Sequence, residues 1–173
     1  MSETPERAFD LTWVRTESLR RLAAMAQCPP SVADEAFRVF HGARNEVEPY
    51  PDVYSGLARL AERFPLYALS NGNADVHQTV LGPYFKLGVS AIQAGAAKPD
   101  SKIFDYLISR VGVRPSQIIH IGDDPVTDVQ GGRLAGCRTV WVNRHQRAWP
   151  EDLPRADAEV NDLHGLSTLL IGA

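Results

Sequence analysis

The sequence has few of the features that mark secreted or membrane proteins. It contains only 2 cysteines, Cys28 and Cys137, whose separation matches no metal-ligand spacing, so we expect two reduced thiols in packed positions. No apolar run approaches the length of a membrane span, and no membrane partner is expected. The first residues, Met1 to Arg7, are polar and lack the apolar core of a signal peptide. We therefore expect a cytoplasmic protein.

An excess of positive charge is also missing. The formal net charge is −3 at pH 7, so no broad basic surface predicts a nucleic acid or an anionic membrane as a partner. What is present is an ordinary globular composition, with 44% hydrophobic and 23% charged residues. A chain of 173 residues suits one domain with a real core and a small appendage.

The first part of the chain has helical patterns and no strand. Apolar residues recur at helical spacing over residues 10–28, and Pro29-Pro30 is expected to end this helix. We expect Ser31 to cap a second helix that carries an apolar face as far as Ala43. A connector with two prolines then leads to a third helix, whose apolar face runs over residues 53–64.

From residue 66 onward, predicted strands alternate with predicted helices. The strands are expected at residues 66–69, 87–92, 118–121 and 139–142, with a short edge strand at 158–160. The helices are expected at residues 74–81, 101–111, from the acidic loop to about residue 135, and 163–170. This alternation is typical of an α/β fold with a doubly wound parallel sheet.

An acidic loop follows the strand predicted at 118–121, which its β-branched residues suggest is buried on both faces. Asp124 is suited to cap the next helix, which leaves Asp123 and Asp128 to converge where ligands bind in open α/β sheets. Two such charges near 4 Å repel by about 4 kcal/mol at an effective dielectric of 20. Either Mg²⁺, which prefers oxygen ligands, or a nearby lysine is expected to offset this repulsion. A helix cap beside a solvated acidic turn is the alternative.

Two further loops follow predicted strands and share this edge of the sheet. Ser70, Asn71 and Gly72 offer a hydroxyl, an amide and backbone N–H groups, which together suit a phosphate. Lys98 adds a cation. Each loop alone is explained by a turn or a solvated lysine, but the three together favour phosphoryl transfer. His120, on the strand before the acidic loop, is expected to be a satisfied core residue.

These loops carry a resemblance to a known family. Leu69-Ser70-Asn71-Gly72, Lys98-Pro99-Asp100 and the stretch from Gly122 to Asp128 resemble the second, third and fourth motifs of haloacid-dehalogenase-like (HAD) hydrolases. The stretch 141–144 resembles the phosphatase branch of that family. The resemblance implies a partial helical cap at residues 1–48 and a Rossmann-like α/β core at residues 49–173.

The resemblance also implies roles for the loop residues. Ser70, with Asn71 and Gly72, would bind the transferring phosphoryl group, and Lys98 would neutralise the phosphate and the nucleophile. Asp123 and Asp128 would hold Mg²⁺. Auxiliary positions at the same edge are Asp124, Asn143 and Arg144. The implied activity is a magnesium-dependent phosphatase that acts on a small phosphorylated metabolite through an aspartyl-phosphate, although dehalogenase chemistry is not excluded.

The first motif of the family is the main departure. It is an apolar strand that ends in Asp-x-Asp-x-Thr and supplies the nucleophile, and only Phe9-Asp10-Leu11-Thr12 is faintly similar to it. No apolar strand precedes Asp10, and the interval to Ser70 is too short for a strand plus a cap. We therefore expect Asp10 to cap the first helix instead.

The missing strand has a structural cost. In the family it lies between the strands predicted here at 66–69 and 118–121, whose unpaired backbone groups would each cost about 1–3 kcal/mol if buried. Either the chain is only marginally stable, or these two strands pair directly, or a partner such as a second copy fills the gap. We expect that the chain lacks the start of its parent protein. A catalytically inactive HAD-like binding or regulatory protein is the alternative, whereas a receiver domain, in which the acidic pair comes first, is set aside.

Overall fold

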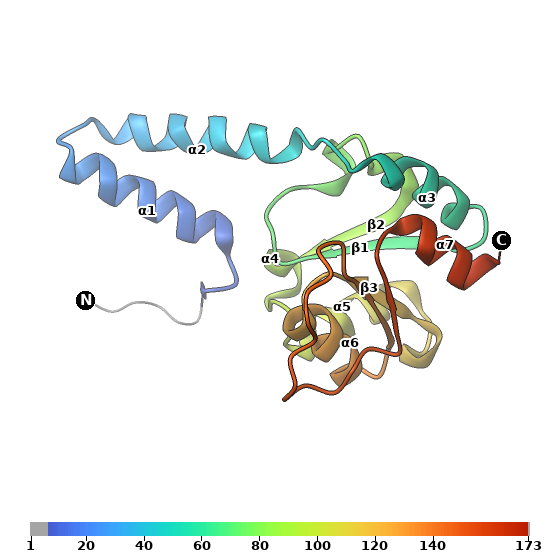
Figure 1. Cartoon of the computed structure of the whole chain (residues 1–173). Coiled ribbons are helices and arrows are strands. Elements are labelled where there is room, and N and C mark those ends of the chain that lie inside the picture. The colour runs from blue at the N-terminus through green and yellow to red at the C-terminus, as the bar shows by residue number, and fades with distance from the viewer. Residues whose placement is uncertain (1–6, 173) are drawn as a thin grey trace.

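The computed structural model describes residues 7–172, which form a helical arm and an α/β body (Figure 1). The arm is an antiparallel pair of helices, α1 (Leu11–Met25) and α2 (Pro30–Asn45). Asp10 caps α1 by accepting a hydrogen bond from the backbone N–H of Trp13, as predicted. The cap predicted at Ser31 is wrong, because α2 already begins at Pro30. Proline is well suited to that first position, since the N–H it lacks would have no helical partner there.

The body contains two parallel sheets rather than one. The first pairs β1 (Leu66–Ser70) with β2 (Phe85–Ser90), and the second has the order β3 (Ile119–Gly122), β4 (Arg138–Val142), β5 (Ala158–Val160). The helices of the body are α3 (Pro51–Ala61), α4 (Ala91–Ala94), α5 (Ser101–Val111), α6 (Gly131–Leu134) and α7 (Leu163–Ile171). Parallel strands alternate with helices, which confirms the predicted α/β class.

The gap between the two sheets lies where the sequence predicted an absent strand. Within residues 7–172, β1 pairs only with β2 and β3 pairs only with β4, so the alternative in which β1 and β3 pair directly is wrong. All residues of β1 and β3 are half-buried. The expectation that the strand at 118–121 is buried on both faces is therefore also wrong. Within the described residues, one edge of this strand has no neighbouring strand to cover it.

Separate apolar clusters support the two sheets. Val89 and Ala91 pack with the inner face of α5, where Ile103 is 0% and Phe104 2% exposed. Beneath the second sheet, Leu60 of α3, Val140 of β4 and Leu166 of α7 form another cluster. The sheets are therefore held mainly from their helical faces, and their strand ends are left free for the loops.

One predicted helix and one predicted packing residue are wrong. The segment 74–81 contains only a short 3-10 helix, Val76–Gln78, and a second one follows at Gly82–Tyr84. Asp75 caps the first turn by accepting from the N–H of His77, and the turn ends after three residues. Cys28 is exposed because it lies in the link between α1 and α2, whereas Cys137 is buried as expected.

The helix predicted after the acidic loop begins irregularly. Residues Pro125–Gln130 form a π-helical turn that leads into α6. The edge strand at 158–160 and the helix at 101–111 are found as predicted, and the helix predicted at 163–170 extends one residue further, to Ile171.

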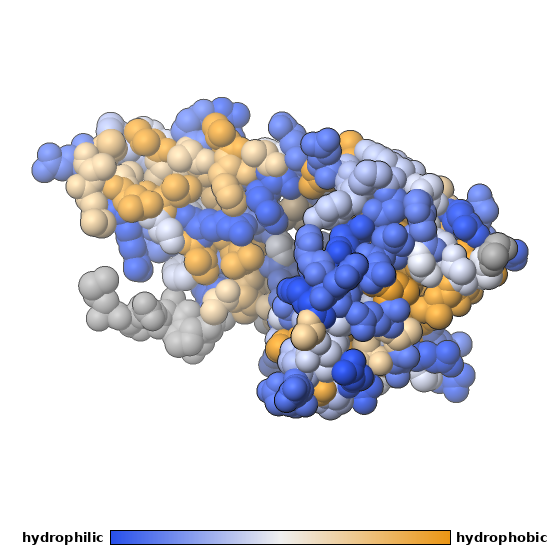
Figure 2. All heavy atoms as spheres, in the orientation of Figure 1, coloured by the Kyte–Doolittle hydropathy of each residue, from blue (hydrophilic) through white to orange (hydrophobic). Residues whose placement is uncertain are grey.

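The arm exposes apolar side chains that stand out in the space-filling view (Figure 2). Leu22, Met25 and Val39 are 59%, 81% and 60% exposed. Even so, no helix within the described part of the chain is long and apolar enough to cross a membrane. The arm corresponds to the partial cap predicted at 1–48, of which residues 1–6 lie outside the described range, and the proposed division into two units stays a prediction.

Candidate functional site

The loops that follow β1 and α4 are tied together at the C-terminal edge of the first sheet. The side chain of Asn71 donates to the backbone carbonyl of Lys98 at 2.9 Å and accepts from the backbone N–H of Lys98 at 2.7 Å. The hydroxyl of Ser70 accepts from the N–H of Gly72 at 2.9 Å. The structure thus brings these four predicted site residues together, and Asn71 acts mainly as the link between the loops.

Lys98 also connects the two sheets. Its Nζ donates to Oδ1 of Asp128 at 2.6 Å and to the carbonyl of Leu69 at 2.9 Å. The side chains of Lys98 and Asp128 are 11% and 7% exposed, so water screens this ion pair weakly. The sequence left open whether Mg²⁺ or a nearby lysine offsets the repulsion in the acidic loop, and the structure shows that a lysine is present.

Asp128 is the most heavily engaged carboxylate of the site. Its Oδ2 accepts from the backbone N–H groups of Asp123 and Asp124, each at 3.1 Å. Burial by itself would raise the pKa of Asp128, but the His120 hydrogen bond and the Lys98 charge together hold that pKa below its ordinary value. Asp128 therefore remains a carboxylate and fixes the ammonium group of Lys98.

His120 is the contact that sequence reasoning missed. Its Nε2 lies 3.3 Å from Oδ1 of Asp128, and its ring meets the ring of Phe104 edge-on at 4.9 Å. It is a packed residue, as predicted, but it also borders the site. Side chains alternate along a strand, so His120 and Gly122 share a face, and a Cβ at Gly122 would lie 2.2 Å from Cγ of Asp128. The alternation of side chains along the strand is the sequence pattern from which the contact between His120 and Asp128 could have been predicted.

The carboxylates of Asp124 and Asp123 differ in whether protein donors already occupy them. Asp124 caps the turn that follows, as predicted, because its Oδ1 accepts from the N–H groups of Val126 at 2.9 Å and Thr127 at 2.7 Å. Asp123 is exposed, and its carboxylate accepts no hydrogen bond from any residue in the range 7–172. Its backbone carbonyl accepts from the indole of Trp141 at 3.0 Å. Asp123 is thus the carboxylate that is free to meet a ligand.

The oxygen donors of the acidic loop can be compared with what Mg²⁺ requires. Mg²⁺ usually keeps several waters and is held by one or two carboxylates together with substrate phosphate oxygens. The exposed carboxylate of Asp123 fits such a position, while both oxygens of Asp128 already accept protein donors. No group of three or more His, Cys, Asp or Glu side chains in the described range is arranged to hold a metal. The donor set is therefore compatible with Mg²⁺ but incomplete.

Arg144 and Asn143 have structural contacts close to this edge. The guanidinium of Arg144 binds both carboxylate oxygens of Asp52, at 2.8 and 2.7 Å, and lowers the pKa of Asp52 to about 2. Asn143 is 3% exposed and bonds the backbone of Arg147 in both directions, which shapes the loop after β4. The auxiliary role of these two residues stays a prediction.

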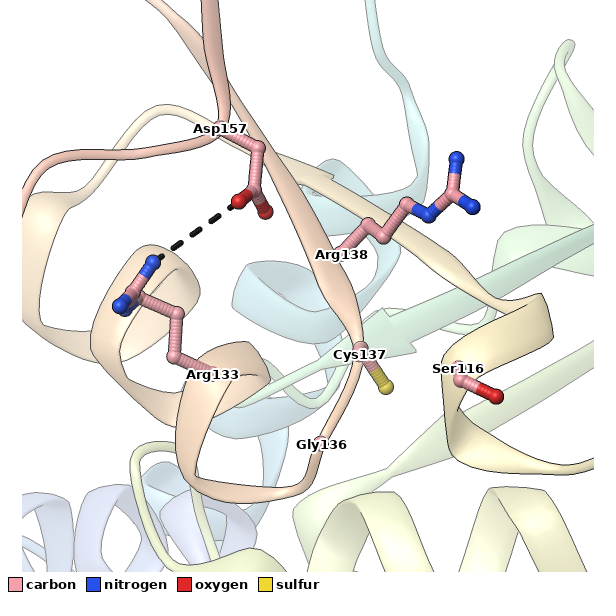
Figure 3. Close-up of a pocket in the computed structure, with 6 residues that line it drawn as sticks. All are labelled: Ser116, Arg133, Gly136, Cys137, Arg138 and Asp157. Atoms are coloured by element: carbon pink, nitrogen blue, oxygen red, sulfur yellow. Dashed lines mark ion pairs between the residues drawn. The ribbon is translucent and has the colours of Figure 1, made fainter.

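Two hollows differ in their relation to the site. One of about 400 Å³ adjoins Asp123 and is also lined by Tyr50, Arg144 and Arg147. The other, of about 310 Å³, is lined by residues that include Arg133, Cys137 and Arg138 (Figure 3). Arg138 begins β4, so this second hollow lies at the N-terminal end of that strand, away from the candidate site.

A family model for haloacid dehalogenase-like hydrolases matches residues 8–136, which include the three loops of the site. The chain belongs to this family. The resemblance stated from the motifs is confirmed, and so is the Rossmann-like class of the fold.

Related proteins include phosphatases and dehalogenases. A phosphoserine phosphatase of Thermus thermophilus is 36% identical over 142 residues, covering 78% of this chain and 56% of the relative. A pyrimidine 5'-nucleotidase of Escherichia coli is 33% identical over 147 residues, covering 82% and 64%. The chain thus spans less than two thirds of the length of these relatives. The crystal structure of a 2-haloacid dehalogenase from Pseudomonas syringae matches with a TM-score of 0.87 and 34% identity, covering 96% of this chain and 72% of that one.

Proposed function

We propose that this chain forms the greater part of a magnesium-dependent phosphatase that acts in the cytoplasm on a small phosphorylated metabolite through an aspartyl-phosphate. The observation that carries the proposal is the position of Lys98, whose Nζ is bonded both to Leu69 at the end of β1 and to Asp128 of the acidic loop. A cation, a hydroxyl and an available carboxylate at one strand edge suit phosphoryl transfer, in which positioning and charge neutralisation supply most of the catalysis.

Each loop has a role in this proposal. Ser70 and the backbone of Gly72 receive the phosphoryl oxygens, and Lys98 neutralises their charge. Asp128 holds the ammonium group of Lys98 in place, and Asp123 is the residue most open to Mg²⁺, with Asp128 beside it. The metal, when bound, would offset charge on the phosphoryl oxygens.

The nucleophile is proposed to come from a strand that lies between β1 and β3 and does not belong to residues 7–172. The open facing edges of these two strands support this, since a strand inserted there would complete both ladders. We propose that this strand comes from a segment of the parent polypeptide outside residues 7–172, since a second copy of the chain could cover the open edges but brings only the same residues. Asp10 is an unsuitable nucleophile, because its carboxylate pairs with Arg7 at 3.0 Å and caps α1.

Hydrolysis of p-nitrophenyl phosphate with and without Mg²⁺ tests the proposal. The assay compares the present chain with a version that carries the in-frame coding sequence upstream of Met1. Magnesium-dependent activity that appears only in the longer version supports the proposed origin of the nucleophile. Inactivity of both versions would instead favour an inactive HAD-like binding or regulatory protein.

Magnesium binding provides a test that needs no turnover. We expect Asp123→Asn to weaken Mg²⁺ binding by about tenfold in calorimetry, since it removes the free carboxylate. Asp124→Asn is the matched control, because Asp124 serves as a cap. Equal Mg²⁺ affinity of Asp123→Asn and the wild-type chain would remove Asp123 from the proposed metal site.

Dehalogenation is a second candidate, favoured by the similarity to the 2-haloacid dehalogenase structure. It predicts chloride release from 2-chloropropionate that does not require Mg²⁺. The phosphatase proposal predicts no such release by either version of the chain, so the same preparations distinguish the two activities.

A further inference from the structure

Arg44 brings a second cation to the loop that follows β1. It lies in the last turn of α2, at the end of the arm that meets the body (Figure 1). A Cβ placed on Gly72 would lie 3.5 Å from Nη2 of Arg44 and 3.1 Å from Oγ of Ser70. The guanidinium of Arg44 is therefore next to the same turn that is proposed to receive phosphate.

The arm is fastened to this loop on both sides of Arg44. His41 Nε2 lies 3.0 Å from the backbone carbonyl of Asn73, and the side-chain oxygen of Asn45 accepts from the N–H of Asp75 at 3.0 Å. Asn73, which is 8% exposed, also donates to the hydroxyl of Thr12 in α1. Arg44 thus projects from a helix end whose position relative to the Ser70–Gly72 loop is fixed.

Within residues 7–172, Arg44 differs from the other arginines of the arm in having no hydrogen-bond or ion-pair partner. Arg20, Arg21 and Arg38 each pair with a carboxylate, and Arg15 donates to the side chain of Asn73. Among residues 7–172, Arg44 has no hydrogen bond or ion pair, and its side chain is exposed. An arginine next to a proposed phosphate site, with all its donors available, is suited to bind an anion.

The placement of the two cations indicates which part of a ligand Arg44 would meet. Lys98 approaches the carbonyl of Leu69, before Ser70, whereas Arg44 approaches Gly72, after it. The turn proposed to receive the phosphoryl group thus has one cation near the residue before Ser70 and another near Gly72, so a second part of the ligand can meet Arg44.

We propose that Arg44 binds a second anionic group of the substrate, so that the substrate class is phosphomonoesters that carry a carboxylate or another phosphate. A guanidinium offers paired donors that match either group bidentately. This inference rests on the proposed function, because it takes the Ser70 loop as the phosphate site.

The test measures binding by calorimetry in the presence of Mg²⁺, with the whole chain and three ligands. Phosphoglycolate carries a carboxylate, ethyl phosphate lacks it, and ethylene glycol bisphosphate carries a second phosphate in its place. The wild-type chain is expected to bind phosphoglycolate or the bisphosphate about tenfold more tightly than ethyl phosphate. Whichever of phosphoglycolate and the bisphosphate binds more tightly identifies the second anionic group.

Variants then assign the preference to a residue. For each variant, the affinity for the tighter of phosphoglycolate and the bisphosphate is divided by the affinity for ethyl phosphate. Arg44→Gln is expected to bring this ratio close to one, and Arg44→Lys to leave an intermediate ratio. Arg38→Gln, on the same helix but paired with Glu35, is the control and should keep the wild-type ratio. Equal wild-type affinities for all three ligands, or a preference that survives in Arg44→Gln, would overturn the role of Arg44 and leave the phosphate site intact. If none of the phosphates binds, both the proposed function and this inference fail.

Discussion

Replacing Asp128 by asparagine removes the charge on which the geometry of the site depends. The wild-type carboxylate accepts from Lys98 and His120 on Oδ1 and from two backbone N–H groups on Oδ2. An asparagine has only one acceptor oxygen, so at least two of these contacts are lost. Each hydrogen bond to a charged group contributes about 1.5–3 kcal/mol, so the loss of two corresponds to about 3–6 kcal/mol of folding free energy. Removing one partner of a buried ion pair costs about 3–5 kcal/mol, which lies within this range.

Asp124→Asn is the matched control for this change. It removes the same charge four residues away, but one side-chain oxygen of Asp124 accepts both backbone N–H groups and the hydroxyl of Thr127. An asparagine oxygen can do the same, so we expect a loss below about 1 kcal/mol. Urea denaturation followed by far-UV circular dichroism measures both variants. If Asp128→Asn lies within about 1 kcal/mol of Asp124→Asn, the buried ion pair does not have the importance that its contacts indicate.

Three further predictions follow from contacts around the site. The pKa of Asp52 is lowered from 3.8 to about 2. The folding free energy that its ionised form contributes is therefore complete well above pH 3.8 and is lost as the pH falls from there toward 2. Between pH 5 and pH 3 the wild-type chain should therefore lose about 1 kcal/mol more folding free energy than Arg144→Met, as measured by denaturant titration; equal losses would contradict this. Gly122→Ala should destabilise by about 1–3 kcal/mol because its Cβ would overlap Asp128, whereas Gly42→Ala, which has open space in α2, should be neutral or stabilising in the same titration. The exposed thiol of Cys28 should react quickly with a disulfide reagent, while burial and the charge of Asp105 raise the pKa of the Cys137 thiol and should make it slow; one slow phase should remain in Cys28→Ser.

The loops of the site could be located from the sequence because parallel strands present their C-terminal ends at a common edge. Ser70, Lys98 and Asp128 each follow a strand that β-branched or apolar residues predict, and the structure brings all three together. The sequence could not decide between a lysine and a metal as the counter-charge for Asp128. That choice depends on a distance between loops that are 30 residues apart in the chain.

The errors arose where a local pattern competed with tertiary contacts. Residues 74–81 have helical propensity, but the cap at Asp75 and the close packing of Gly82 on the backbone of His77 leave room only for short turns. The auxiliary role of Arg144 stays a prediction, but its ion pair is a contact that the sequence could not reveal. Its partner, Asp52, precedes it by 92 residues, and no local pattern indicates that pairing.

The hydrogen bond between Trp141 and Asp123 gives the site an optical property of its own. The indole of Trp141 is 1% exposed, donates to the Asp123 carbonyl at 3.0 Å and meets the ring of Trp149 edge-on at 5.0 Å. An indole held this way is sensitive to the electric field of the adjoining loop, so we expect a cation bound at Asp123 to shift its emission. In a Trp13→Phe background, which removes the remaining tryptophan in α1, intrinsic fluorescence becomes a label-free titration signal for occupancy of the acidic loop.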